Sequence, residues 1–157
     1  MQRSFMFGLA LALVAASGFA GPAAAPGEQT PFKGSLEGFV TRTPVPPLVA
    51  VDIDAAGNAT HLGAFSLEVP HLVDPATRTA TGTYTFTAAD GSEVHAEFTG
   101  VSALTAIPGV LYIVENATIT GGTGRFEGAS GGFVCERFFD TVSGETYGYF
   151  NGAISTP

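Results

Sequence analysis

The fold of this chain is decided by residues 79–88, which read TATGTYTFTA. Threonine takes every second position, and small or aromatic residues take the positions between. Successive side chains of a β-strand point to opposite faces of a sheet, so this alternation predicts a strand with one polar and one apolar face. Asp90-Gly91 follows and predicts a tight hairpin, because glycine readily adopts the positive φ that such turns require.

The same period of two extends through the rest of the chain. We expect eight strands, near residues 32–43, 48–54, 63–73, 79–88, 93–103, 110–119, 131–139 and 145–154. Turn residues separate them, among them Ala56-Gly57-Asn58, and no later stretch has convincing helical periodicity. Eight short strands predict an all-β fold, a closed antiparallel eight-stranded barrel, because closure removes the exposed sheet edges. A two-sheet sandwich is the alternative.

Glycines inside the expected strands support a curved sheet. Gly34 and Gly38 in the first strand have the same spacing as Gly148 and Gly152 in the last. Glycine permits the coiling that a small barrel needs, and the first and last strands must pair if the barrel closes.

Residues 1–25 have the pattern of a secretory signal peptide. Arg3 precedes an apolar run from Phe5 to Ala16, and small residues allow cleavage near Ala25. An uncleaved membrane anchor is the alternative. We expect residues 26–31 to form a flexible N-terminal segment and residues 32–157 the barrel domain, secreted or periplasmic and free of the membrane after cleavage.

Charge and cysteine content exclude several classes. The chain has 6 basic and 14 acidic residues, a formal net charge of −8, so it lacks the basic face of a nucleic-acid binder. Cys135 is its only cysteine and cannot form an internal disulfide. No spacing of histidine, cysteine and acidic residues indicates a metal site, and we expect no cofactor.

The most distinctive segment is residues 120–131, TGGTGRFEGASG. It resembles the Gly-Gly-(Ser/Thr)-Gly-x-Phe-x-Gly-Ala turn of allene oxide cyclases and plant dirigent proteins. The resemblance extends well over residues 110–154 and implies an eight-stranded barrel of the calycin type, often trimeric, with an apolar or phenolic guest inside. In the cyclases a glutamate of the first strand is followed by a His-Ser-Pro pattern. No such pattern follows Glu37 here, so cyclase activity does not carry over.

Glycines of this segment predict a sharp structural turn. We assign that role to Gly121, Gly122, Gly124, Arg125, Phe126 and Gly128. The ring of Phe126 is expected to fold inward and plug one barrel end, while Arg125 bonds carbonyl groups of the turn or pairs with Glu127. An anion-binding loop is the alternative, although the motif lacks the ending of a P-loop.

Glu115 is the main candidate for a binding residue. It shares a strand face with Leu111 and Ile113, and if that face points inward, burial raises its pKa and suits it to contact a guest. A structural ion pair with Arg125 or Arg137 is the alternative. Tyr112 and Glu37 are the other proposed ligand contacts.

Two further groups favour structural roles. Glu93, His95 and Glu97 alternate along one strand, which is typical of a solvated outer face. Cys135 has no histidine nearby in sequence and is expected to be a buried, inert thiol.

The final hairpin carries aromatic residues on both faces. If those of one face fill the barrel, those of the other face are left on its outer surface. This predicts a homo-oligomer, a dimer or trimer. We expect a non-catalytic secreted barrel that binds a small apolar molecule or serves as an assembly module. The alternative is a cyclase- or dirigent-like enzyme, of isomerase type, that guides a reactive apolar substrate.

Overall fold

A computed structural model describes residues 27–157 of the chain. The predicted signal peptide lies outside the described residues. The alternating sequence forms nine strands and one short 3₁₀ helix: β1 (Thr30–Val45), β2 (Leu48–Ala59), β3 (Gly63–Glu68), β4 (His71–Asp74), β5 (Thr79–Ala88), β6 (Glu93–Leu104), β7 (Val110–Gly122), η1 (Gly124–Phe126), β8 (Ser130–Asp140) and β9 (Glu145–Ser155).

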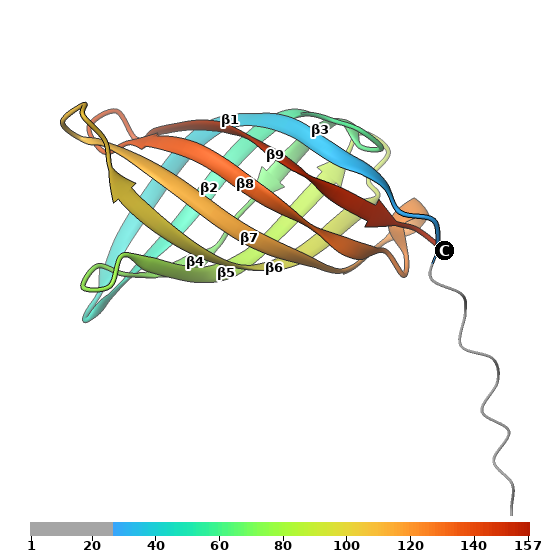
Figure 1. Cartoon of the computed structure of the whole chain (residues 1–157), viewed down its shortest axis with the longest axis horizontal. Helices are drawn as coiled ribbons and strands as arrows, with labels where there is room; N and C mark the ends of the chain where they lie inside the picture. Colours follow the sequence, from blue (N-terminus) through green and yellow to red (C-terminus); the bar gives the residue numbers. More distant parts are fainter. Residues whose placement is uncertain (1–26) are drawn as a thin grey trace, which may run out of the picture.

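The strands form one closed antiparallel sheet. Neighbours follow the order β1-β9-β8-β7-β6-β5-β3-β2-β4, and β1 also pairs with β2 while β5 pairs with β4. β3 and β4 both lie between β2 and β5, so together they occupy one of eight positions around the barrel. The predicted eight-stranded barrel is therefore confirmed, and Figure 1 shows β1 and β9 running side by side to complete it.

Pro70 divides the strand that the sequence predicts at residues 63–73. β3 ends at Glu68 and β4 begins at His71, so the prediction of one continuous strand is wrong. Proline has no N–H to donate to a sheet, which explains the break. The ladder is bridged there by Val69 N–H donating to the Ile53 carbonyl at 3.0 Å and Thr83 N–H donating to the Pro70 carbonyl at 3.2 Å.

The turn predicted at Ala56-Gly57-Asn58 is not present. β2 continues to Ala59, and Gly57 pairs with Leu36 of β1 and Phe65 of β3. A Cβ atom at Gly57 would overlap the Ser35 carbonyl and lie 2.8 Å from the Phe65 ring, so glycine allows close approach here instead of a reversal. At the other boundary, β1 begins at Thr30, two residues before the predicted start.

Glycines of β1 and β9 lie where neighbouring strands approach most closely. A Cβ atom at Gly38 would be 2.6 Å from the Ala55 Cα atom, and one at Gly148 would be 2.6 Å from the Arg137 Cα atom. The first and last strands pair over ten residue positions, from Thr30 opposite Ile154 to Phe39 opposite Glu145. The predicted pairing of the first and last strands is confirmed.

One end of the barrel is filled by phenylalanine. Neighbouring ring centroids lie 5.1 to 6.1 Å apart in a cluster of five inward rings: Phe32, Phe65, Phe86, Phe133 and Phe150. Phe126 of η1 is buried over this end, as predicted for the plug. Gly124 and Gly128 adopt φ of +58° and +73°, the left-handed conformation that lets the chain reverse on both sides of the ring.

Arg125 fastens the turn differently from the prediction. Its Nε atom lies 3.1 Å from Asp90 Oδ2, and its guanidinium donates to the Leu62 carbonyl at 3.4 Å and covers the Phe126 ring at 4.7 Å. The partners therefore come from two other loops at this end, not from Glu127. In Figure 1 this is the end at which β1 begins and β9 ends. Among the described residues, no α-helix has the length and apolarity needed to cross a bilayer.

Candidate functional site

A cluster of polar side chains lies inside the barrel, beyond the phenylalanine layer. Glu115 of β7 is fully buried, and Arg137 of β8 is 4% exposed. The Arg137 guanidinium donates to both carboxylate oxygens, from Nη2 to Oε1 at 2.7 Å and from Nε to Oε2 at 3.1 Å. Tyr84 of β5 donates its hydroxyl to Glu115 Oε2, and Arg137 also donates to Thr146 Oγ1 at 3.2 Å. The ion-pair alternative for Glu115 is thus confirmed, with Arg137 as partner.

Burial would by itself raise the pKa of Glu115, as a lone inward carboxyl was expected to show. The opposing effects of the Arg137 charge, its hydrogen bonds and the Tyr84 hydroxyl are together larger, and they hold the pKa of Glu115 below its ordinary value. Glu115 is therefore a carboxylate at neutral pH, and the expectation of a raised pKa is wrong. The paired geometry suits it to fix Arg137 and Tyr84, and not to donate a proton.

Tyr84 and Cys135 are both protonated at neutral pH. Burial, together with the Glu115 charge, raises the pKa of Tyr84 well above its ordinary value. Burial also raises the pKa of the Cys135 thiol to about 12. A nucleophilic cysteine needs a low pKa, so the buried thiol has the inert character expected from the sequence.

His71 joins the cluster from β4. Its Nδ1–H donates to the Val69 carbonyl at 2.9 Å, and its ring packs edge-on against Phe98 with centroids 5.6 Å apart. Because a carbonyl only accepts, this bond leaves Nε2 of the neutral ring as an acceptor. Burial lowers the pKa of His71, so the neutral ring is the form present at pH 7. The Pro70 break frees the Val69 carbonyl for this role.

A cavity of about 280 Å³ opens between this cluster and the other end of the barrel. Glu115, Arg137 and His71 border it in the interior, and Arg42 of β1 and Arg78 of the turn between β4 and β5 border it nearer the open end. Its remaining walls are mainly apolar, with inward side chains that include Val40, Val49, Val51, Val73, Ala80, Leu111, Ile113 and Phe139. This is the size and character of a site for a small, mostly apolar molecule.

Of the three proposed ligand contacts, only Glu115 borders this cavity. Tyr112 lies three positions before Glu115 on β7, an odd separation, so its side chain is on the opposite, outer face of the sheet. There its hydroxyl donates to Glu136. Glu37 is likewise exposed on the outer face of β1. Successive positions of one strand face opposite sides of the sheet, so Tyr112 points away from the face of Glu115 on β7, and Glu37 points away from the face of Leu36 on β1.

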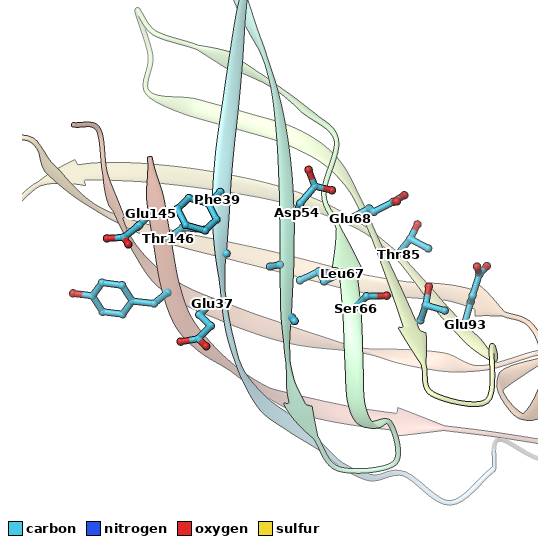
Figure 2. Close-up of a pocket in the computed structure, with 15 residues that line it drawn as sticks. Glu37, Phe39, Asp54, Ser66, Leu67, Glu68, Thr85, Glu93, Glu145 and Thr146 are labelled. Atoms are coloured by element: carbon cyan, nitrogen blue, oxygen red, sulfur yellow. The ribbon is translucent and has the colours of Figure 1, made fainter. Parts of the chain in front are cut away.

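The outer surface carries a second, more open hollow of about 910 Å³ over β1, β2, β3 and β9. Figure 2 shows the carboxylates of Glu37, Asp54, Glu68 and Glu145 standing off these strands without converging on one point. Among residues 27–157, no three His, Cys, Asp or Glu side chains are placed to hold a metal ion. Glu93, His95 and Glu97 lie outside as predicted, with His95 Nε2 2.8 Å from Glu93 Oε2.

Sequence reasoning missed His71, Tyr84 and Thr146 as members of the interior cluster. Each carries the right signal, an inward position within an alternating strand. Which of these inward residues meet is decided by the register of the strands. It brings together residues of β4, β5, β7, β8 and β9 that are as many as 75 positions apart (from 71 to 146).

Comparison with known proteins adds evidence on the fold. No family model and no curated protein matches the sequence. The solved structure of the pterocarpan synthase dirigent protein GePTS1 matches with a TM-score of 0.56 and 14% identity, covering 87% of this chain and 96% of that chain. The pterocarpan synthase dirigent protein PsPTS1 matches with a TM-score of 0.58 and 12% identity, covering 84% and 97%. With the closed eight-stranded barrel described above, these similarities show that the chain has the fold of the dirigent-like barrels.

Proposed function

We propose that this protein is a non-catalytic binding protein that holds a small, mostly apolar molecule in the open end of its barrel. The observation that carries the proposal is the cavity of about 280 Å³, which has apolar walls and a polar floor. Burying an apolar guest there removes its surface from water, and a few polar groups fix its orientation.

The state of the polar floor supports binding over catalysis. The Glu115 carboxylate is held by Arg137 and Tyr84, so it has little freedom to exchange a proton. The high pKa of Cys135 removes the one thiol as a nucleophile. The floor is thus suited to present fixed dipoles and N–H donors to a guest.

A toluene titration of the chain without residues 1–25, followed by NMR, tests this function. Ala80 borders the cavity, so Ala80→Phe is expected to fill it and abolish the shifts of the surrounding resonances. Val114 lies on the outer face of β7, and Val114→Phe is the matched control that keeps binding. Unchanged binding in Ala80→Phe, or no binding by the natural chain, would contradict the proposal.

The alternative function is a dirigent-like enzyme that guides a reactive apolar substrate. It is favoured by the fold shared with two pterocarpan synthase dirigent proteins and by the polar cluster at the cavity floor. Native mass spectrometry of protein from its own source distinguishes the two. A binding protein retains one compound unchanged, whereas an enzyme converts an added compound to one of different mass or structure.

We further propose that the protein acts outside the cytoplasm, in the periplasm or the medium. The support is the signal-peptide pattern of residues 1–25. N-terminal sequencing of the exported protein is expected to begin near Pro26, and a chain that still begins at Met1 would contradict this.

A further inference from the structure

Basic residues of this acidic chain are unevenly placed. Residues 27–157 contain fourteen acids and five basic residues, Lys33, Arg42, Arg78, Arg125 and Arg137. Three of the five basic residues border the interior cavity, whereas Glu115 is the only one of the fourteen acids that does so. The cavity therefore has the opposite sign of charge from the molecule as a whole.

Pairing inside the cavity leaves the positive charge at its rim. The Glu115 carboxylate is neutralised by Arg137, at 2.7 Å. Among the described residues, no carboxylate lies within 4.0 Å of the Arg42 or Arg78 guanidinium. Asp74 and Asp140 lie at the same end, but Asp74 accepts the Ala76 amide at 2.8 Å and Asp140 accepts turn amides of its own loop.

Arg42 is held over the cavity mouth. It occupies an inward position of β1, its guanidinium lies 5.3 Å from the centroid of the Phe139 ring, and it donates to the Thr141 carbonyl at 3.4 Å. Phe139 is one of the cavity walls. The Arg42 charge thus stands beside apolar lining, and its other N–H groups remain available to a guest.

Arg78 reaches the rim from the turn between β4 and β5. Its backbone has φ of +56°, a conformation that glycine or asparagine adopts more easily, and its carbonyl accepts the Ser102 amide at 3.0 Å. The side chain borders the cavity. The turn therefore carries an arginine at a position where the backbone favours other residues.

We propose that the guest is a small apolar carboxylate, with its acid group at the rim between Arg42 and Arg78 and its apolar part in the cavity. This rests on the proposed binding function and names its ligand class. Guanidinium groups bind carboxylates through charge-assisted hydrogen bonds, and a rim of one sign also attracts a counter-ion into an apolar cleft. The cavity volume, near the lower end of the range of about 300–1,000 Å³ for ligand sites, limits the guest to a small molecule.

Two compounds of similar shape separate the contribution of charge to the binding affinity from that of apolar burial. They are cyclohexanecarboxylate and cyclohexanecarboxamide, each titrated into the protein at pH 7 by calorimetry. We expect the carboxylate to bind roughly ten-fold more tightly, the equivalent of one charge-assisted contact of about 1.4 kcal/mol. Raising the salt concentration should reduce this preference, because exposed charges are screened.

Arg42→Gln and Arg78→Gln should each reduce the preference, and the double variant should bind both probes equally. Lys33→Gln is the matched control, because it removes the same charge from the outer face of β1. Both arginines are exposed, so these variants are expected to fold, which circular dichroism checks.

Equal binding of the two probes by the natural chain would overturn this inference and leave the binding function standing. A preference that survives in the Arg42→Gln/Arg78→Gln variant would overturn it as well. If neither probe bound, and toluene did not bind, both the inference and the proposed function would fail.

Discussion

Glu115 and Arg137 form an ion pair between two buried side chains inside the barrel. Removing one partner leaves the other buried without compensation, so we expect Glu115→Gln to lower the free energy of unfolding by about 3–5 kcal/mol. Tyr84 would also lose a charged acceptor for its hydroxyl. Urea denaturation, followed by circular dichroism, measures the loss.

A double replacement tests whether the loss comes from the unpaired charge. Glu115→Leu with Arg137→Met removes both charges, and apolar pairs of similar volume often replace buried ion pairs at little cost. We expect this variant to be more stable than Glu115→Gln. If both variants were equally unstable, the ion pair would not be the source of the effect.

The ion pair between Glu115 and Arg137 also predicts how the free energy of unfolding depends on pH. The pKa of Glu115 is below its ordinary value of 4.5 in the folded chain, so the unfolded chain takes up its proton first as the pH falls. The stabilisation is complete above about pH 4.5 and is lost as the pH falls through the lower folded pKa. Urea midpoints between pH 7 and pH 3 should therefore fall more for the natural chain than for Glu115→Leu/Arg137→Met, and parallel curves would contradict this.

Closure of the barrel depends on glycines at the β1–β2 and β8–β9 contacts. In Gly38→Ala the new Cβ atom would overlap the Asp54 carbonyl and lie 2.6 Å from the Ala55 Cα atom, so the two strands must separate. Overpacking of this kind costs about 1–3 kcal/mol, and we expect a loss of that size in thermal or urea unfolding. Ser35→Ala, at an exposed position of the same strand, is the control. Equal midpoints for the two variants would show that β1 and β2 are not closely packed at Gly38.

At the level of single strands, alternation predicted the position and type of most strands. Residues 79–88 form β5 as predicted, and the first and last strands pair. The prediction failed at Gly57, a residue that favours a turn in isolation, and at Pro70, where a strand was predicted to continue through a residue that cannot donate to the ladder. Gly57 instead allows contact with β1 and β3, which are far from it along the chain or across a turn. These contacts between distant strands override the tendency of glycine to form a turn, and the sequence around Gly57 does not reveal them.

For the whole molecule, the sequence predicted a closed barrel but not which residues meet inside it. Glu115 and Tyr112 are three positions apart in one strand, an odd separation, so their side chains lie on opposite faces of the sheet and only Glu115 faces the cavity. Tyr84 and Arg137 reach Glu115 from β5 and β8, and His71 borders the same cavity from β4, through the register of several strands. Register is set by all the pairings together, so the candidate site was only partly predictable.

The outer face of β7, β8 and β9 carries several partly exposed aromatic side chains. An outer aromatic patch, made of Tyr112, Phe138, Tyr147 and Tyr149, crosses these strands, with ring centroids of 5.4 Å between Tyr112 and Phe138 and 5.7 Å between Phe138 and Tyr147. Tyr147 and Tyr149 are each more than half exposed. Contiguous aromatic surface of this kind marks an interface in soluble proteins.

We propose that two or three copies of the chain associate through the outer aromatic patch. Burial of these rings drives association, and Tyr147→Glu should oppose it by placing a charge near the Glu136 carboxylate, which accepts the Tyr112 hydroxyl. Analytical ultracentrifugation at micromolar concentration should give a dimer or trimer for the natural chain and a monomer for Tyr147→Glu. Thr83→Glu adds the same charge to the exposed face of β5 and should leave the mass unchanged. A monomeric natural chain would contradict the proposal, and dissociation of Thr83→Glu would show that net charge, rather than the patch, controls assembly.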